Sequence, residues 1–258
     1  MIPKIIHYCW FGGSSKPPLA EKCIESWKNH FPDFEIKEWN EDNYDVLSAP
    51  VYVREAYAEK KWAFVSDYVR FDVVYRFGGI YFDTDVEVIK SFEDILSAGA
   101  FMGREDGLNG TATVAAGLGF GCEKGHPVLR EILDLYSGLS FRNSDGSLNT
   151  VTVVTYVTDI LRKHGLKDNC EIQNIEGIRI YPVDYFCPIN ELGEKKNFSK
   201  NTHSIHWYSA SWYSDEENRK KADLIRKNKL DKIIHLPNRA IKRILGEDRY
   251  EKLKSKIK

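Results

Sequence analysis

Three carboxylates at alternate positions follow a short apolar segment: Asp83, Asp85 and Glu87 in IYFDTDVE. If residues 80–88 form one strand, these acids share a face with Tyr81, because side chains two apart in a strand point the same way. Three acids on one face repel one another unless a cation or solvent separates them. A hard divalent cation prefers such oxygen ligands. The spacing therefore predicts a cation site, with Glu87 left open to a simpler role at a solvated rim.

An acid and a base three residues apart precede these carboxylates: Asp67 and Arg70 in SDYVRFDVVYRF. We expect a helix over about residues 63–77, on which the two side chains share a face, and Gly78-Gly79 to end it. The pair is either an ordinary surface ion pair or a buried one. Apolar neighbours favour a buried helix, where an Asp and an Arg need polar partners: Val65, Val69, Val73 and Val74.

The beginning of the chain has the pattern of a β-α-β unit. Residues 4–11, KIIHYCWF, predict a buried strand, 17–30 an amphipathic helix opened by two prolines, and 34–39, FEIKEW, a second strand. A crossover helix implies that the two strands are parallel. Trp10 ends the first strand, where open α/β sheets bind their ligands. The alternative for Trp10 is a place in the core.

Further helices and short strands are expected along the rest of the chain. The glycine-rich residues 109–121 match neither the GxxxxGK[ST] nor the GxGxxG phosphate-binding pattern. They predict a strand with flanking loops or a loop near a ligand. Helices are expected over 44–62, 126–139 and 150–163, and strands within 101–104, 170–188 and 203–212.

Composition favours a folded protein of the reducing cytosol. The 258 residues are 42% hydrophobic, enough for one large domain or a domain with an appendage and too apolar for a disordered chain. The five cysteines are odd in number and show no CxxC spacing, which disfavours a zinc site or a disulfide framework. The first residues do not have the pattern of a signal peptide, and no apolar run approaches the roughly 18 residues of a membrane span.

These stretches together resemble glycosyltransferase family 32, sugar transferases with a DxD motif. The family includes bacterial capsular-polysaccharide transferases, yeast initiating mannosyltransferases and, more distantly, clostridial glucosylating toxins. SDxxR, GGIY and DxD occur in the family's order and spacing. The matching stretches span most of residues 1–212: IPKIIHYCWFGG, AFVSDYVRFDVVYRFGGIYFDTDVEVI, GCEKGHP and HWYSASW.

The resemblance implies a GT-A fold, a Rossmann-like α/β sandwich, over residues 1–214. It also implies a nucleotide-sugar donor, a Mn²⁺ or Mg²⁺ ion, and retention of the anomeric configuration. By position, Asp85 would bind the metal, and Asp83 would meet the donor ribose or sugar, or the metal through water. Asp67 and Arg70 match the pair that holds the donor sugar and its phosphate side.

The resemblance assigns five further residues to the donor. Tyr81 matches an aromatic near the diphosphate, and Trp10 matches the tryptophan that stacks on the nucleobase. His206, Ser211 and Trp212 match a C-terminal element that closes over the diphosphate and completes the metal shell. In the toxin relatives an acidic residue of that element helps to hold the metal, so His206 is either a ligand or a structural histidine.

The function implied is transfer of a hexose, from a UDP-hexose, to a saccharide or lipid-linked saccharide acceptor in surface polysaccharide synthesis. One alternative is a haloacid-dehalogenase-type phosphatase, whose apolar strand is followed by DxDx[TV]. Here Glu87 stands at the Thr or Val position, and the motif follows about the third strand rather than the first. The other alternative is a non-catalytic module that binds a nucleotide sugar; the intact DxD and SDxxR motifs disfavour it.

A basic segment ends the sequence. Residues 219–258 hold 15 Lys and Arg against 5 Asp and Glu, a net charge of +10, so the rest of the chain carries −11. We expect a helix-rich extension over 215–258 that is either solvated or in peripheral contact with an anionic membrane at its cytoplasmic face. The negative charge of the rest of the chain and the absence of a nucleic-acid-binding motif disfavour nucleic acid as the partner of this segment. The membrane alternative rests on apolar residues in this segment: Ile233, Ile234, Leu236, Ile241, Ile244 and Leu245.

Overall fold

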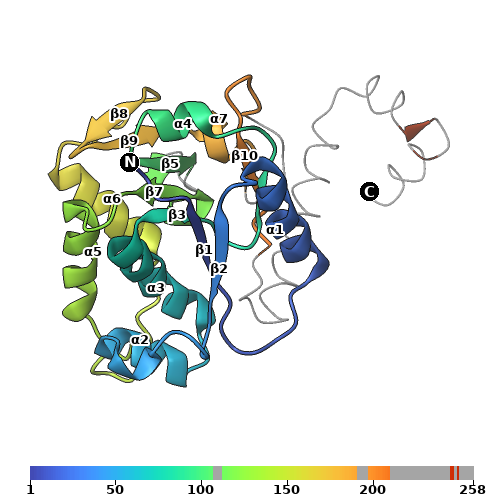
Figure 1. Ribbon diagram of the computed structural model, residues 1–258. Coiled ribbons are helices and arrows are strands. Elements are labelled where there is room, and N and C mark those ends of the chain that lie inside the picture. Colours follow the sequence, from blue (N-terminus) through green and yellow to red (C-terminus); the bar gives the residue numbers. More distant parts are fainter. Residues whose placement is uncertain (107–111, 191–196, 210–244, 247–248, 250–258) are drawn as a thin grey trace. The chain divides into compact units, whose positions relative to one another are not determined.

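The computed structural model describes residues 1–106, 112–190, 197–209, 245, 246 and 249 (Figure 1). Residues Met1–Ser209 form one compact unit. The predicted boundary between residues 214 and 215 and the predicted helical extension lie outside the described residues and stay predictions. Among the described residues, no helix is both long enough and apolar enough to cross a membrane.

The chain begins with the predicted β-α-β unit. Strand β1, Ile5–Cys9, is followed by helix α1, Pro18–His30, and strand β2, Glu35–Trp39. Prolines precede and open α1, because a fixed φ suits the first helical turn and the missing N–H is not needed there. The two strands are parallel along their whole length, with Ile5 opposite Glu35. The predicted crossover is therefore confirmed.

The central sheet is mixed. Its hydrogen-bonded order is β2-β1-β3-β7-β5-β9-β8, with β6 paired to β5 outside this path. Strands β1, β2 and β3 are parallel, β7 runs antiparallel between β3 and β5, and β9 is parallel to β5. The further strands are β3 Gly79–Tyr81, β5 Phe101–Asp106, β6 Ala112–Val114, β7 Phe120–Cys122, β8 Gln173–Ile175 and β9 Ile178–Tyr181.

Helices cover both faces of the sheet (Figure 1). Alternate residues of each strand supply the two cores: Ile80 and Phe82 pack on the α1 side, and Tyr81 packs on the α3 side. One layer holds α2 Val51–Ala58, α3 Trp62–Phe77, α5 Pro127–Ser137 and α6 Val153–Lys163. The other holds α1, α4 Glu93–Ser97 and α7 Val183–Phe186. Short 3₁₀ turns lie at Val46–Ser48 and Ala116–Leu118. This is the predicted Rossmann-like α/β sandwich.

Helix α3 ends where the sequence predicted. Gly78 caps it with a φ of 67°, and Gly79 follows with a φ of 111°, backbone conformations that a side chain disfavours. Strand β3 starts at once, so α3 and β3 meet at a sharp corner. Asp67 and Arg70 are both buried on α3, which confirms the prediction of a buried helix.

The prediction of one continuous strand over residues 80–88 is wrong. Strand β3 ends at Tyr81, and a separate strand β4, Val86–Val88, pairs antiparallel with β10, Ser204–His206. A turn joins them, closed by the Val86 N–H, which donates to the Asp83 carbonyl at 3.0 Å. The Asp-Thr-Asp sequence suits a turn, because Asp side chains compete with strand hydrogen bonding. The acids at 83, 85 and 87 therefore do not line a single strand face.

Candidate metal and donor site

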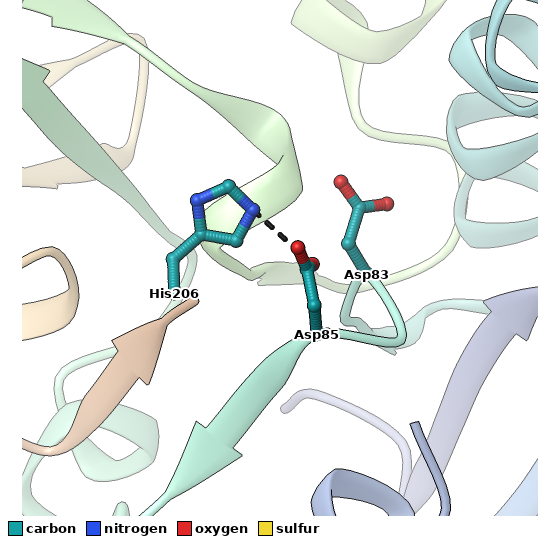
Figure 2. A group of neighbouring side chains, drawn as sticks. All are labelled: Asp83, Asp85 and His206. Atoms are coloured by element: carbon teal, nitrogen blue, oxygen red, sulfur yellow. Dashed lines mark ion pairs between the residues drawn. The ribbon is translucent and has the colours of Figure 1, made fainter. Parts of the chain in front are cut away.

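The turn between β3 and β4 brings two of the three acids together with a histidine from far along the chain. Figure 2 shows Asp83 and Asp85 on this turn and His206 at the end of β10. One ligand atom from each of the three lies within 4.8 Å of the others. The pairing of β10 with β4, with His206 opposite Val86, places the histidine there.

Asp85 is the most strongly held of the three. The Ser209 N–H and hydroxyl both donate to its Oδ2, at 2.8 and 3.0 Å, and His206 Nε2 lies 3.2 Å from its Oδ1. Burial opposes ionisation of this carboxyl. His206 and the two Ser209 donors outweigh burial and hold the pKa of Asp85 well below its usual range. Asp85 is therefore a carboxylate whose surroundings favour its charged form, as an oxygen ligand of a cation would require.

His206 is buried, and its Nδ1 has no hydrogen-bond partner among the described residues. Its Nε2 lies 3.2 Å from Asp85 Oδ1 and is paired with that carboxylate. Burial disfavours the imidazolium, but the Asp85 carboxylate outweighs burial and raises the pKa of His206 to about 9. Without a cation, the imidazolium supplies the positive charge that the two acids need.

The cluster fits a divalent cation. Two carboxylates and an imidazole are groups that coordinate such ions, and a buried ring whose Nδ1 has no partner among the described residues is otherwise costly. Asp85 and His206 would hold the ion, joined by Asp83 directly or through water. The pairing of His206 with Asp85 fits either a metal ligand or a structural histidine, so both interpretations of His206 stay predictions.

Asp83 is tied to the wall formed by α3. The Tyr81 hydroxyl donates to its Oδ1 at 2.9 Å, and Arg70 reaches both carboxylate oxygens at 3.4 Å. Burial is the main cause that raises the pKa of Asp83, and Arg70 opposes it. Gly117 leaves room for this carboxylate, because a Cβ there would lie 2.2 Å from Asp83 Oδ2.

Arg70 joins the two predicted parts of the site. Its Nη2 lies 2.9 Å from Asp67 Oδ1, and its guanidinium lies 5.0 Å from the Tyr81 ring centroid. Burial raises the pKa of Asp67 to about 6, against the effect of Arg70 and of the Val153 N–H at the start of α6. The sequence did not single out this contact with α6. The predicted grouping of Asp67, Arg70, Tyr81 and Asp83 is thus present in the structure.

Trp10 lies at the edge of a separate hollow. A cavity of about 700 Å³ opens where β1 and β2 end, and three aromatic rings, those of Trp10, Tyr57 and Trp62, contribute to its lining. The Lys16 ammonium lies 5.7 Å from a Trp10 ring centroid and 2.6 Å from Glu38. Strand β1 is parallel to β3, so the carboxyl ends of the two strands lie at the same end of the sheet. The cavity and the acidic turn both follow these carboxyl ends.

Two predicted residues, Ser211 and Trp212, lie outside the described residues. Instead, Ser209 of the same HWYSASW stretch binds Asp85. The sequence pointed to this stretch, but the stretch contains two serines, and spacing alone does not say which one reaches Asp85. Glu87 is absent from the cluster because its carboxylate binds Lys22 and Trp207.

Comparison with known proteins finds a partial family match. Residues 17–102 match the family described as "Glycosyltransferase sugar-binding region containing DXD motif". This part of the chain is similar to the sugar-binding region of glycosyltransferases. This region contains Asp67, Arg70, Asp83 and Asp85, and the match confirms the resemblance to DxD sugar transferases. His206 lies outside the matched residues 17–102, and so does Trp10 at the edge of the cavity.

Individual relatives are also glycosyltransferases. An uncharacterized glycosyltransferase of Acanthamoeba polyphaga mimivirus is 28% identical over 157 residues, covering 57% of this chain and 59% of that protein. Inositol phosphoceramide mannosyltransferase 3 of Schizosaccharomyces pombe is 28% identical over 138 residues, covering 51% of this chain and 36% of that protein. The alignments thus leave large parts of both relatives uncovered.

Solved structures show partial similarity. The PaToxG glycosyltransferase aligns with a TM-score of 0.48 and 20% identity, over 63% of this chain and 69% of that one. A glycosyltransferase involved in the glycosylation of the major capsid of PBCV-1 aligns with a TM-score of 0.45 and 11% identity, over 87% of this chain and 100% of that one.

Proposed function

We propose that the chain is a metal-dependent, retaining glycosyltransferase. It transfers a hexose from a nucleotide sugar, a UDP-hexose, to a saccharide or lipid-linked saccharide acceptor in surface polysaccharide synthesis. The observation that carries this proposal is the meeting of Asp83, Asp85 and His206 beside Arg70 at one edge of the sheet. The basic residues 219–258 support the proposal that the enzyme acts in the cytoplasm, at the inner face of a membrane.

Each part of the site has a task in such a transfer. Asp85, His206 and Asp83 would hold a Mn²⁺ or Mg²⁺ ion, which would supply Lewis-acid stabilisation of the departing diphosphate. Arg70 is buried and always charged, and it adds charge-assisted hydrogen bonds on the phosphate side. Asp67 accepts sugar hydroxyls and stabilises positive charge at the ring. The cavity beside Trp10 takes the nucleoside, with an aromatic face for the base.

The chemical step that we propose is substitution on one face of the sugar. The bond between the anomeric carbon and the diphosphate oxygen breaks, and the acceptor oxygen bonds to the same carbon from the same side. The acceptor proton passes to the leaving phosphate. Asp67 is engaged by Arg70, and Asp83 by Arg70 and Tyr81, so we assign neither as a nucleophile.

A donor panel tests the function. Purified protein is incubated with Mn²⁺, a saccharide acceptor mixture and UDP-glucose, UDP-galactose, UDP-N-acetylhexosamines or GDP-mannose, and released nucleotide is measured. We expect release from a UDP-hexose, loss of release with a chelator, and a product of unchanged anomeric configuration by NMR. Release of nucleotide from GDP-mannose alone would show that the donor is GDP-mannose and not a UDP-hexose. No release from any donor, with hydrolysis of p-nitrophenyl phosphate instead, would contradict the transferase proposal.

Asp85→Asn tests the metal assignment. Removing the charge at the most strongly held ligand should lower turnover by roughly 100-fold or more, because Lewis-acid stabilisation of the leaving group is worth several kcal/mol. Calorimetry should show loss of Mn²⁺ binding with the fold retained. Asp134→Asn, which removes an exposed ion pair with Arg130, is the matched control and should change neither quantity. Wild-type activity in Asp85→Asn would remove the metal assignment.

A further inference from the structure

Glu87, the third acid of the central stretch, has no role in the cluster described above. Its Oε2 lies 2.8 Å from Lys22 Nζ on α1 and 2.9 Å from Trp207 Nε1. The carboxylate is mostly buried, at 16% exposure, whereas the Lys22 side chain is 56% exposed. The Lys22 ammonium also lies 5.3 Å from a Trp207 ring centroid. Glu87 therefore joins α1, β4 and the residues that follow β10.

Trp207 is placed to control the metal cluster. In the sequence it lies between His206 and Ser209, which both contact the Asp85 carboxylate. The backbone N–H of Trp207 donates to the Asp85 backbone carbonyl at 3.0 Å. The Trp207 side chain is thus attached to the same short backbone segment that places His206 and Ser209 beside Asp85.

The segment from His206 to Ser209 is strained and needs anchors. Tyr208 has a φ of 50°, which is unfavourable for a residue with a side chain and persists only where surrounding contacts impose it. The residue before Tyr208 is held through its side chain, because the Trp207 indole N–H donates to Glu87. Tyr208 is held through its own side chain, because its hydroxyl donates to Glu105 at 3.0 Å. The first of these anchors uses a residue from the DxD stretch itself.

We infer that Glu87 is a positioning residue, which with Lys22 and Trp207 forms a latch that holds His206 and Ser209 against Asp85. The latch deepens the proposed function and rests on it, because its purpose is to keep the metal and diphosphate site formed. Trp207 donates to an ionised carboxylate, the stronger class of hydrogen bond. Lys22 is half exposed, and its ion pair contributes less. Loss of the indole N–H should therefore open the latch more than loss of Lys22.

The test compares Trp207→Phe, Glu87→Gln, Lys22→Met and the double variant Glu87→Gln/Trp207→Phe in the full chain. Glu25→Gln, which removes the exposed pair with Lys28 on the same helix, is the matched control. Hydrogen exchange is followed at the Trp207 and Ser209 amides, which donate to Asp85. Calorimetry gives the affinity for Mn²⁺ with UDP, and steady-state kinetics give donor KM and kcat.

We expect Trp207→Phe to speed exchange of both amides about tenfold and to weaken Mn²⁺·UDP binding by about 10-fold to 100-fold, the usual range for residues that orient ligands. Donor KM should rise while kcat at saturation stays within about threefold, because the latch sets the fraction of molecules that are competent to bind. Lys22→Met should have a smaller effect. The double variant should be worse than Trp207→Phe by no more than the effect of Lys22→Met, since the two single changes act on the same Glu87–Trp207 contact and Glu87→Gln adds only the weakened Lys22 pair.

Two results would overturn the latch. One is unchanged amide exchange and affinity in Trp207→Phe. The other is a loss of thermal stability with wild-type affinity and KM, which would make the contact merely structural. The exchange measurement needs neither metal nor donor. If the proposed function fails, wild-type protein binds no Mn²⁺·UDP, yet faster exchange at the two amides in Trp207→Phe still supports the latch.

Discussion

Asp83 and Asp85 are separated by one residue, yet their surroundings shift their pKa values in opposite directions. Asp85 receives two hydrogen bonds from Ser209 and the charge of His206, which overcome its burial. The pKa of Asp83 is dominated by burial, which the Tyr81 hydrogen bond and the longer contacts with Arg70 do not overcome. The turn geometry explains the difference, because it directs one carboxylate towards the C-terminal segment and the other towards α3. The DxD pattern by itself treats the two acids alike.

Gly117→Ala tests how closely Asp83 must be placed. The new Cβ would lie 2.2 Å from Asp83 Oδ2, so the carboxylate must turn away from Arg70 and Tyr81. We expect kcat/KM to fall by roughly 10-fold to 100-fold, because small displacements of a positioned group lower the rate strongly, while the folded state is kept. Steady-state kinetics and thermal unfolding measure the two effects.

Gly138→Ala is the matched control for this substitution. A Cβ at Gly138, at the end of α5, would meet only the Leu135 carbonyl oxygen, at 3.6 Å. Its activity should equal that of the wild type. Equal activity in Gly117→Ala would show that the position of Asp83 is not critical.

At the scale of elements, His7 ties three parts of the fold together. It lies on β1, fully buried, where its Nε2 lies 2.8 Å from the Gly78 carbonyl and its Nδ1 accepts from Trp39 Nε1 at 3.1 Å. The bonds link β1 to the corner after α3 and to β2. Burial lowers the pKa of His7 to about 4, so the ring is neutral in the native state. These contacts give His7 a structural role.

This buried histidine predicts a pH dependence of stability. Between pH 6.5 and about 4 the unfolded chain binds a proton at this position and the native protein does not. Its contribution is complete above pH 6.5 and is lost as pH falls towards 4, up to about 3 kcal/mol. Urea unfolding from pH 4.5 to 8 should show a steeper loss for the wild type than for His7→Gln. His30→Gln, at the end of α1, should behave as the wild type; equal slopes in all three proteins would contradict the prediction.

The elements were largely predictable, and the exceptions share a cause. The β-α-β unit, α3 and the glycine corner follow from local periodicity and from the conformational freedom of glycine. The prediction of a continuous strand over 80–88 was wrong, because the alternation of apolar and polar residues continues through a turn that separates two sheets. The pairing of β4 with β10 joins residues more than a hundred positions apart. No local pattern carries such a contact.

For the whole molecule, the uneven charge predicts membrane association of the basic segment. Neutralising Lys252, Lys254, Lys256 and Lys258 to Gln in the full chain should weaken binding to vesicles containing phosphatidylserine at least tenfold, since each basic residue near an anionic surface contributes about 1 kcal/mol. Co-sedimentation measures the binding. Vesicles of phosphatidylcholine alone are the control and should bind both proteins weakly. Unchanged binding to the anionic vesicles would favour a solvated segment.

The α/β fold class, the DxD stretch and the burial of Asp67 and Arg70 on their helix could all be predicted from the residues alone. These depend on residue type and short spacing, which local sterics and burial translate directly into structure. Only the tertiary structure decided that His206 and Ser209 meet Asp85, and that Glu87 holds Trp207 instead of a cation. Those contacts arise from pairing between distant segments, whose partners are chosen by the packing of the whole sheet and its helices.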